Sequence, residues 1–159
     1  MASWSSFVAS APEFAAKARA RFDATKHHVL ATVRRDGSPR VSGTEVRFFD
    51  GELTLGSMPG AVKVRDLQRD PRFAIHANPG DGSMDGGDAK IAGSATEVLD
   101  EAVLSRFVGD QDGEMPDGPF HLFVLDIAEV VVTELHPDGD RLVITTWTPG
   151  GGVRTVERR

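Results

Sequence analysis

Short apolar segments with a period of two run through most of the chain. Val29 to Val33 is apolar and β-prone, and Leu53 and Leu55 alternate with polar neighbours. Such a pattern is typical of strands that bury one face against a core. We therefore predict strands at residues 29–33, 40–49, 52–56, 73–75, 90–98 and 141–147, and two more within 120–133 that meet at a bend near 126–129.

Three segments follow the helical period instead. Apolar side chains recur at every fourth position from Phe14 to Phe22, which predicts one buried helical stripe. Ser10 and Glu13 form a capping box in front of it. Two further helices are expected, one beginning at 57–60 and ending before Pro71, and one running from a cap at Asp100 to residue 108.

The turns between the strands are short and rich in glycine. Asp36-Gly37 and Asp50-Gly51 are hairpin signals because glycine tolerates a positive φ. Longer Gly/Asp-rich loops are expected at 78–88 and 109–118. There is no internal repeat and no linker, so we predict one domain over residues 1–159 with an N-terminal helix. Short connections between strands favour an antiparallel barrel, closed or partly closed, that is decorated by helices.

Composition narrows the possible partners. The chain has 159 residues and a formal net charge of −6, which argues against binding to a nucleic-acid backbone. It contains no cysteine, so disulfides, thiolate nucleophiles and Cys-ligated metals are excluded. No apolar run is long enough to span a membrane, and the N-terminal sequence lacks the pattern of a signal peptide. Cytoplasmic localisation is therefore expected.

One segment has the features of an anion site. It reads Gly56-Ser57-Met58-Pro59-Gly60-Ala61-Val62-Lys63 and joins the end of a predicted strand to the start of a predicted helix. Free N–H groups at a helix N-terminus, a serine hydroxyl and a lysine together suit a phosphate group. Equally, Ser57 can serve only as a helix cap, with Lys63 solvated. The residues alone leave both interpretations open.

Other chemical motifs are weak. His27 and His28 are adjacent and would point to opposite sides of a strand, so they are poorly placed to share a metal. The remaining histidines, His76, His121 and His136, lie on separate predicted elements. We predict no metal site. The sequence has no nucleophile elbow, no phosphate-binding Walker motif and no HExxH motif, which excludes the common hydrolase and kinase classes.

The order of several motifs resembles one family. "LATVRRDGSPRVSGTEV" is followed by "GELTLGS", by a Lys-x-Arg-x-Leu helix and by Asp70-Pro71-Arg72 before a strand. "KIAGSATEV", "GPFHLFVLDIAEVV" and "ITTWTPGGGVR" then follow in the usual order of the pyridoxamine 5'-phosphate oxidase-like family. The resemblance covers nearly the whole chain. It implies a mainly β α+β fold, the antiparallel split β-barrel of the FMN-binding type.

The resemblance also implies a homodimer with two cofactor sites at the subunit interface. By position, Ser57 and Lys63 correspond to contacts of the cofactor phosphate, with Arg40 near the family's phosphate-binding arginine. The strand Val41–Thr44 corresponds to backbone along the flavin ring, and Trp147 to a tryptophan that approaches the partner's cofactor. A core or interface anchor is the alternative role for Trp147. The expected cofactor-binding set is Arg40, Val41, Ser42, Gly43, Thr44, Gly56, Ser57, Met58, Lys63 and Trp147.

The function that this resemblance implies is an oxidoreductase that transfers hydride to or from a small substrate. The expected cofactor is FMN, and the deazaflavin coenzyme F-420 is the alternative. The family's Arg-Leu-x-Pro segment has no match at Trp147-Thr148-Pro149-Gly150, which argues against oxidation of pyridoxamine phosphate itself. A different class of function also stays open: a non-catalytic module that binds a flavin, a deazaflavin or haem, with His76, His121 or His136 as the axial ligand of a haem. We assign no catalytic residue.

Overall fold

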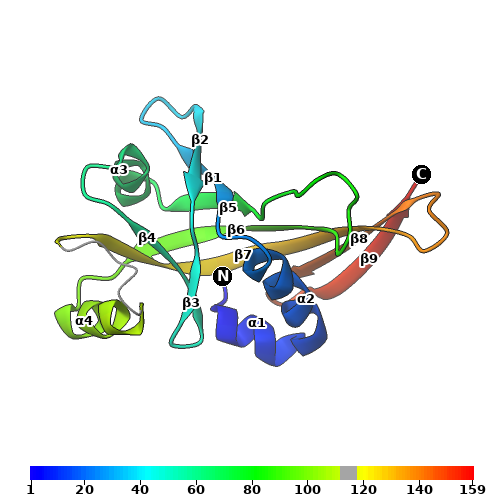
Figure 1. Cartoon of the computed structure of the whole chain (residues 1–159), viewed down its shortest axis with the longest axis horizontal. Helices are drawn as coiled ribbons and strands as arrows, with labels where there is room; N and C mark the ends of the chain where they lie inside the picture. The colour runs from blue at the N-terminus through cyan, green and yellow to red at the C-terminus, as the bar shows by residue number, and fades with distance from the viewer. Residues whose placement is uncertain (112–117) are drawn as a thin grey trace.

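The computed structural model describes residues 1–111 and 118–159 (Figure 1). Its four helices are α1 Trp4–Ser10, α2 Pro12–Asp23, α3 Val62–Arg69 and α4 Glu101–Asp110. Its strands are β1 His28–Val33, β2 Pro39–Thr44, β3 Arg47–Phe49, β4 Glu52–Ser57, β5 Arg72–His76, β6 Asp88–Glu97, β7 His121–Leu135, β8 Leu142–Thr148 and β9 Gly152–Arg158. No helix in the described part of the chain is both long and apolar enough to cross a membrane.

The described strands form one antiparallel sheet. Hydrogen-bonded neighbours follow the order β2-β1-β5-β6-β7-β4-β3, and β8 and β9 continue from the second half of β7. The ends of this order, β2 and β3, do not pair with each other, so the sheet is not closed by hydrogen bonds. The predicted α+β class with a mainly β architecture is confirmed, and the split barrel is an open, strongly curved sheet of this kind (Figure 1).

Helices α1 and α2 cover one face of the sheet. Figure 1 shows both lying over the central strands, and they contact β4, β6 and β7. The aromatic side chains of Trp4, Phe7, Phe14 and Phe22 fill this face, as the four-residue period predicted for the last two. Helix α4 covers a separate, smaller cluster around Phe107. Burial of these apolar faces is the main stabilising term of the fold.

Apart from α4, which packs on Phe49 of β3 and Leu122 of β7 at one end, no helix lies over the opposite face of the sheet in the described structure. We call it the open face, and define it by one row of residues that pair across seven strands. Its apolar members are partly exposed, as the 40% exposure of Val29 illustrates. From β2 to β9 the row is Gly43, Val29, His76, Lys90, Val131, Thr146 and Arg154.

The predicted pair of strands within 120–133 is a single long strand, β7, with an irregularity in place of a break. The register between β6 and β7 shifts at Ala92/Gly93, where Gly93 faces Ile127. A Cβ on Gly93 would collide with the backbone carbonyl of Asp126, so only glycine fits this bulge. The bend expected near 126–129 is therefore taken up without ending the strand.

Further predictions about individual elements are corrected by the structure. Ser10 does not cap α2, because it is the last residue of α1 and the cap position is Ala11. The strand expected at 40–49 is two strands, β2 and β3, which pair with different partners. No strand was predicted after residue 147, whereas Gly152–Arg158 form strand β9.

Ser57 belongs to β4, and α3 begins only at Val62. The loop predicted at 109–118 begins within α4, and its central residues 112–117 lie outside the described part of the chain.

Candidate functional site

Lys63 and Gly43 bring α3 and the edge strand β2 together. Lys63 Nζ donates to the carbonyl oxygen of Gly43 at 2.9 Å. Burial lowers the pKa of Lys63, and the Glu45 carboxylate opposes that decrease. An ammonium group has three donors, and among residues 1–111 and 118–159 the Gly43 oxygen is the only acceptor bonded to it. A half-buried cation with unused donors is a suitable anion ligand.

The surroundings of this lysine leave space for a ligand. A Cβ added at Gly43 or Gly56 would meet no other atom within 4 Å. Val41 and Met58, at the two sides, are 70% and 68% exposed. No side chain caps the N-terminus of α3, although the first-turn N–H of Val64 donates to the Ala61 carbonyl oxygen.

Arg40 is hydrogen-bonded within the chain. Its Nε donates to Asp66 Oδ2 at 2.6 Å, and Asp66 also accepts from Arg69 at 3.0 Å and Thr32 at 2.9 Å. Burial raises the pKa of Asp66, but the hydrogen bonds from Arg40, Arg69 and Thr32 outweigh it and give a net decrease. Because Asp66 is buried, this network fixes α3 to β1 and β2. It positions the helix that carries Lys63.

Ser57 lies at the other end of the loop that leads into α3. It is the cross-strand partner of His121. His121 Nδ1 lies 2.6 Å from Glu97 Oε1, and Gln68 Nε2 of α3 donates to Glu97 Oε2 at 2.8 Å. Burial raises the pKa of Glu97, whereas the hydrogen bonds from His121 and Gln68 lower it, with a net decrease. The carboxylate is therefore ionised and ties the two strand ends to α3.

Trp147 belongs to the core of its own chain. Its side chain packs against Phe7, with 4.6 Å between ring centroids, and its Nε1 donates to Ser10 Oγ at 2.9 Å. The tryptophan is almost fully buried on the face covered by α1. A cavity of about 400 Å³ beside it is lined by Ser6, Ser10 and residues of the β8–β9 turn. Contact between Trp147 and a partner's cofactor stays a prediction.

A second cavity adjoins the end of β2. It has a volume of about 370 Å³ and lies between residues 22–26, at the end of α2, and residues 45–47, which connect β2 to β3. Neither cavity is lined by Lys63 or Ser57. The predicted residues therefore form an open surface in the single chain. Most of them, including Val41–Thr44, Gly56–Met58 and Lys63, lie around β2 and the loop before α3, whereas Trp147 is separate from them.

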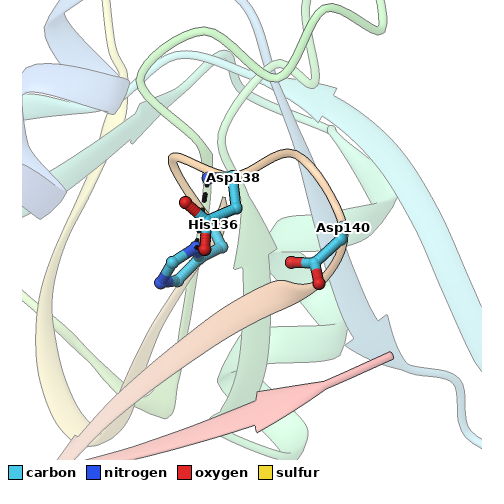
Figure 2. Close-up of side chains that lie close together, drawn as sticks. All are labelled: His136, Asp138 and Asp140. Carbon is cyan, nitrogen blue, oxygen red and sulfur yellow. Dashed lines mark hydrogen bonds and ion pairs between the residues drawn. The ribbon is translucent and has the colours of Figure 1, made fainter.

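The turn between β7 and β8 brings together three residues whose side chains can bind a metal ion. Ligand atoms of His136, Asp138 and Asp140 lie within 4.8 Å of one another (Figure 2). The cation among them is Arg141, which donates to His136 at 2.8 Å and to Asp140 at 2.6 Å. It also bonds Glu157 of β9 at 2.7 Å. Arg141 thus neutralises the cluster and joins the turn to β9, which explains these residues without a metal ion.

The other histidines are separated in space by their elements. His28 is buried, which lowers its pKa, and its Nδ1 accepts from the Asn78 backbone N–H. His76 lies in the open-face row, where its Nδ1 contacts the Ala77 carbonyl oxygen. With His121 bonded to Glu97 and His136 to Arg141, no two of the predicted haem-ligand candidates meet in the described structure.

Sequence reasoning missed Asp66, Glu97 and the open-face row. Asp66 had a detectable signal, since it is a carboxylate at the i−3 position of an arginine on the apolar side of a predicted helix, between Val64 and Leu67. Glu97 had no such signal, because its partners Gln68 and His121 are 29 and 24 residues away along the sequence. The open face depends on strand register, which periodicity does not specify.

The sequence of residues 14–134 matches the family model described as pyridoxamine 5'-phosphate oxidase. The chain belongs to this family. The match begins in α2 and ends near the end of β7, so it includes Lys63, Ser57 and all of β2. No curated protein matches the sequence significantly.

Solved structures show the same fold at low identity. A pyridoxamine 5'-phosphate oxidase-related, FMN-binding protein of Nostoc punctiforme is 16% identical with a TM-score of 0.65, covering 94% of this chain and 96% of its own. PhzG of Burkholderia lata 383, solved with tetrahydrophenazine-1-carboxylic acid, is 15% identical with a TM-score of 0.63, covering 94% and 93%. A pyridoxamine 5'-phosphate oxidase-type protein of Listeria innocua is 18% identical with a TM-score of 0.59, covering 74% and 95%.

Proposed function

We propose that this member of the pyridoxamine 5'-phosphate oxidase family is a homodimeric, cytoplasmic flavin-dependent oxidoreductase whose cofactor is FMN. The observation that carries the proposal is the half-buried ammonium of Lys63, bonded to the Gly43 carbonyl at the exposed edge of β2. An anionic cofactor would supply the acceptors that Lys63 lacks. The FMN named for the Nostoc protein is a cofactor of this chemistry.

The residues present fit such a cofactor in charge and in space. Lys63 and the uncapped N-terminus of α3 offer donors to a phosphate. Gly43 and Gly56 leave the adjoining backbone accessible to a planar ring, since even an added Cβ would have room at both positions. Ser57, at the end of β4, is the nearby hydroxyl donor in this proposal.

The charges around the site favour FMN over F-420, whose acidic tail is longer. Four basic residues lie on β2 and α3: Arg40, Lys63, Arg65 and Arg69. Arg40 and Arg69 both bond the single carboxylate of Asp66, so their guanidinium groups are already engaged within the chain. Lys63 and Arg65 are left for the ligand. Two cations suit a single phosphate better than an extended polyanion.

In this proposal the bound flavin supplies hydride transfer, and the protein binds and orients it. Lys63 holds the phosphate end, and the Val41–Thr44 backbone lies along the ring. Asp66 keeps α3, and with it Lys63, in register with β2. No side chain is proposed as a proton donor to the substrate, whose identity stays undefined beyond a small molecule.

The open face supports the homodimer. It bears apolar side chains without a cover, including Val131 of β7, Ile144 of β8 and Val156 of β9, and the last of these is 46% exposed. Partly exposed apolar side chains gathered on one face are typical of an interface between identical subunits. Gly43 lies in the open-face row, so a second copy on this face would cover the β2 surface and enclose the cofactor.

The visible absorption spectrum of the purified protein tests the function. FMN, F-420 and haem are added separately, and the protein is passed through gel filtration. Retention of the FMN spectrum, followed by bleaching with a chemical hydride donor and reoxidation, is the expected result. Retention of F-420 in place of FMN would overturn the cofactor assignment. Retention of haem, or of a flavin that cannot be reduced in the complex, would establish the non-catalytic binding module. No retained chromophore would refute both.

A further inference from the structure

His121 lies beside Ser57, and the proposed flavin site uses the hydroxyl of Ser57 but not the imidazole of His121. They are direct cross-strand partners on β7 and β4. Side chains of such partners share one face of the sheet, with Cβ atoms about 4.5–5.5 Å apart. Ser57 is also the last strand residue before the loop that leads to α3 and Lys63. A group bound at Ser57 is therefore within reach of His121.

Glu97 determines which atom of His121 is available. Because the Glu97 carboxylate is ionised and only accepts hydrogen bonds, the ring nitrogen that faces it at 2.6 Å, Nδ1, carries a hydrogen. The second nitrogen, Nε2, has no hydrogen-bond partner within residues 1–111 and 118–159. The His121 side chain is 30% exposed, so a ligand has access to it.

The chemistry of the pair selects an anion. In the imidazolium form both ring nitrogens of a histidine carry a hydrogen, so Nε2–H donates to an anion while Nδ1–H donates to the carboxylate. The Ser57 hydroxyl adds a second donor. Glu97 does not repel an anion strongly, because its two oxygens already accept from His121 and Gln68. A phosphate monoester, with several strong acceptor oxygens, matches this set.

We infer that His121, oriented by Glu97, is a ligand of the cofactor phosphate together with Ser57. This rests on the proposed flavin function for the identity of the phosphate, but not for the existence of the anion site. The competing explanation is a structural latch, in which Gln68, Glu97 and His121 only fasten α3 to the sheet. A latch would affect the binding of every flavin equally. A phosphate ligand affects only flavins that carry a phosphate.

Paired titrations with FMN and riboflavin at about pH 6 separate the two. Riboflavin has the same ring and lacks the phosphate. We expect His121→Gln to weaken FMN binding about tenfold or more, as for a lost charged hydrogen bond, and riboflavin binding less than about twofold. His121→Lys should restore most of the FMN affinity. His136→Gln is the matched control, because it removes a histidine at the far end of β7. Equal losses for both flavins, or no loss for either, would overturn the inference while leaving flavin binding intact.

A second measurement does not depend on flavin. Inorganic phosphate is titrated into the wild-type protein, and the His121 imidazole signals are followed by NMR. A saturable shift at His121, with none at His136, supports the site even if the protein binds no flavin. Absence of a shift at His121 overturns it. The same titration decides the matter if His121→Gln does not fold.

Discussion

Arg40 of β2 donates its Nε to the buried carboxylate of Asp66 on α3, 2.6 Å away. This one contact joins the edge strand of the candidate site to the helix that carries Lys63. It also explains why Arg40, which resembles a phosphate-binding arginine by position, has a different task in the single chain. The network around Asp66 stabilises the site's framework, and its removal is the first test of that conclusion.

Replacing Asp66 with Asn should destabilise the protein by about 3 kcal/mol, because the ion pairs of the buried carboxylate with Arg40 and Arg69 are lost. Urea unfolding at neutral pH measures the difference. Asp50→Asn is the control, since Asp50 forms an exposed pair with Arg106 in a turn and should change stability by less than about 0.5 kcal/mol. Similar losses for the two variants would contradict the structural role of Asp66.

The loss of stability in Asp66→Asn should depend on pH. The folded-state pKa of Asp66 is lowered, so its ionised form contributes stability above the unfolded-state value of about 4. That contribution is lost as the pH falls through the lower, folded-state pKa. The difference in unfolding free energy between wild type and Asp66→Asn should therefore be constant from pH 7 to about 5 and shrink below about 4. A difference that grows on acidification would show the opposite sign of shift.

Lys63→Ala should weaken FMN binding by about 1–3 kcal/mol, the usual value for a charge-assisted hydrogen bond. Fluorescence titration of FMN gives the affinity directly. Lys17→Ala is the matched control, because Lys17 is half exposed and pairs with Glu134 away from β2. An unchanged affinity in Lys63→Ala would remove Lys63 from the cofactor site.

Gly43→Val should abolish flavin binding and leave the fold intact. Within the chain a Cβ at this position meets nothing within 4 Å, so the added side chain obstructs only a ligand or a second subunit. Gly93→Ala provides the contrast: its Cβ would meet the Asp126 carbonyl oxygen, and a loss of about 2 kcal/mol or more is expected. Thermal unfolding and flavin titration of both variants are the measurements. Loss of stability in Gly43→Val would mean that its role is structural.

Ile144→Lys should convert the dimer into a monomer. Ile144 lies on the open face opposite Thr133 and Val156, where a charge would be buried at the proposed interface at a high desolvation cost. Light scattering at micromolar concentration reports the mass. Lys17→Ala again serves as a control on the other side of the molecule. A monomeric wild type would refute the homodimer, and a variant that stays dimeric would show that the interface lies elsewhere.

Most of the individual elements could be predicted because each depends on neighbours in the chain. Short apolar runs marked β1 and β5, alternation marked β4, and Asp100 does cap α4 through its bonds to Ala102 and Val103. The failures have local causes as well. Ser10 is a residue type that commonly caps helices, but its hydroxyl donates to the Phe7 carbonyl oxygen and accepts from Trp147 Nε1 instead. Strand β9 was missed because all its residues are exposed. The strand therefore has no alternation of buried apolar and exposed polar residues, on which strand prediction depends.

The sequence by itself determined the class of the fold, the family, and the segment from Gly56 to Lys63 as the place to look for a phosphate. These depend on residue types at short separations, which act before the chain is compact. Only the tertiary structure decided which side chains remain free for a ligand. Arg40 is hydrogen-bonded to Asp66, and Trp147 to Ser10. Lys63 keeps unused donors, and His121 is held by Glu97 through Nδ1 alone. The reason is physical: buried polar groups must find partners, and partners distant in sequence are chosen by strand register and helix packing.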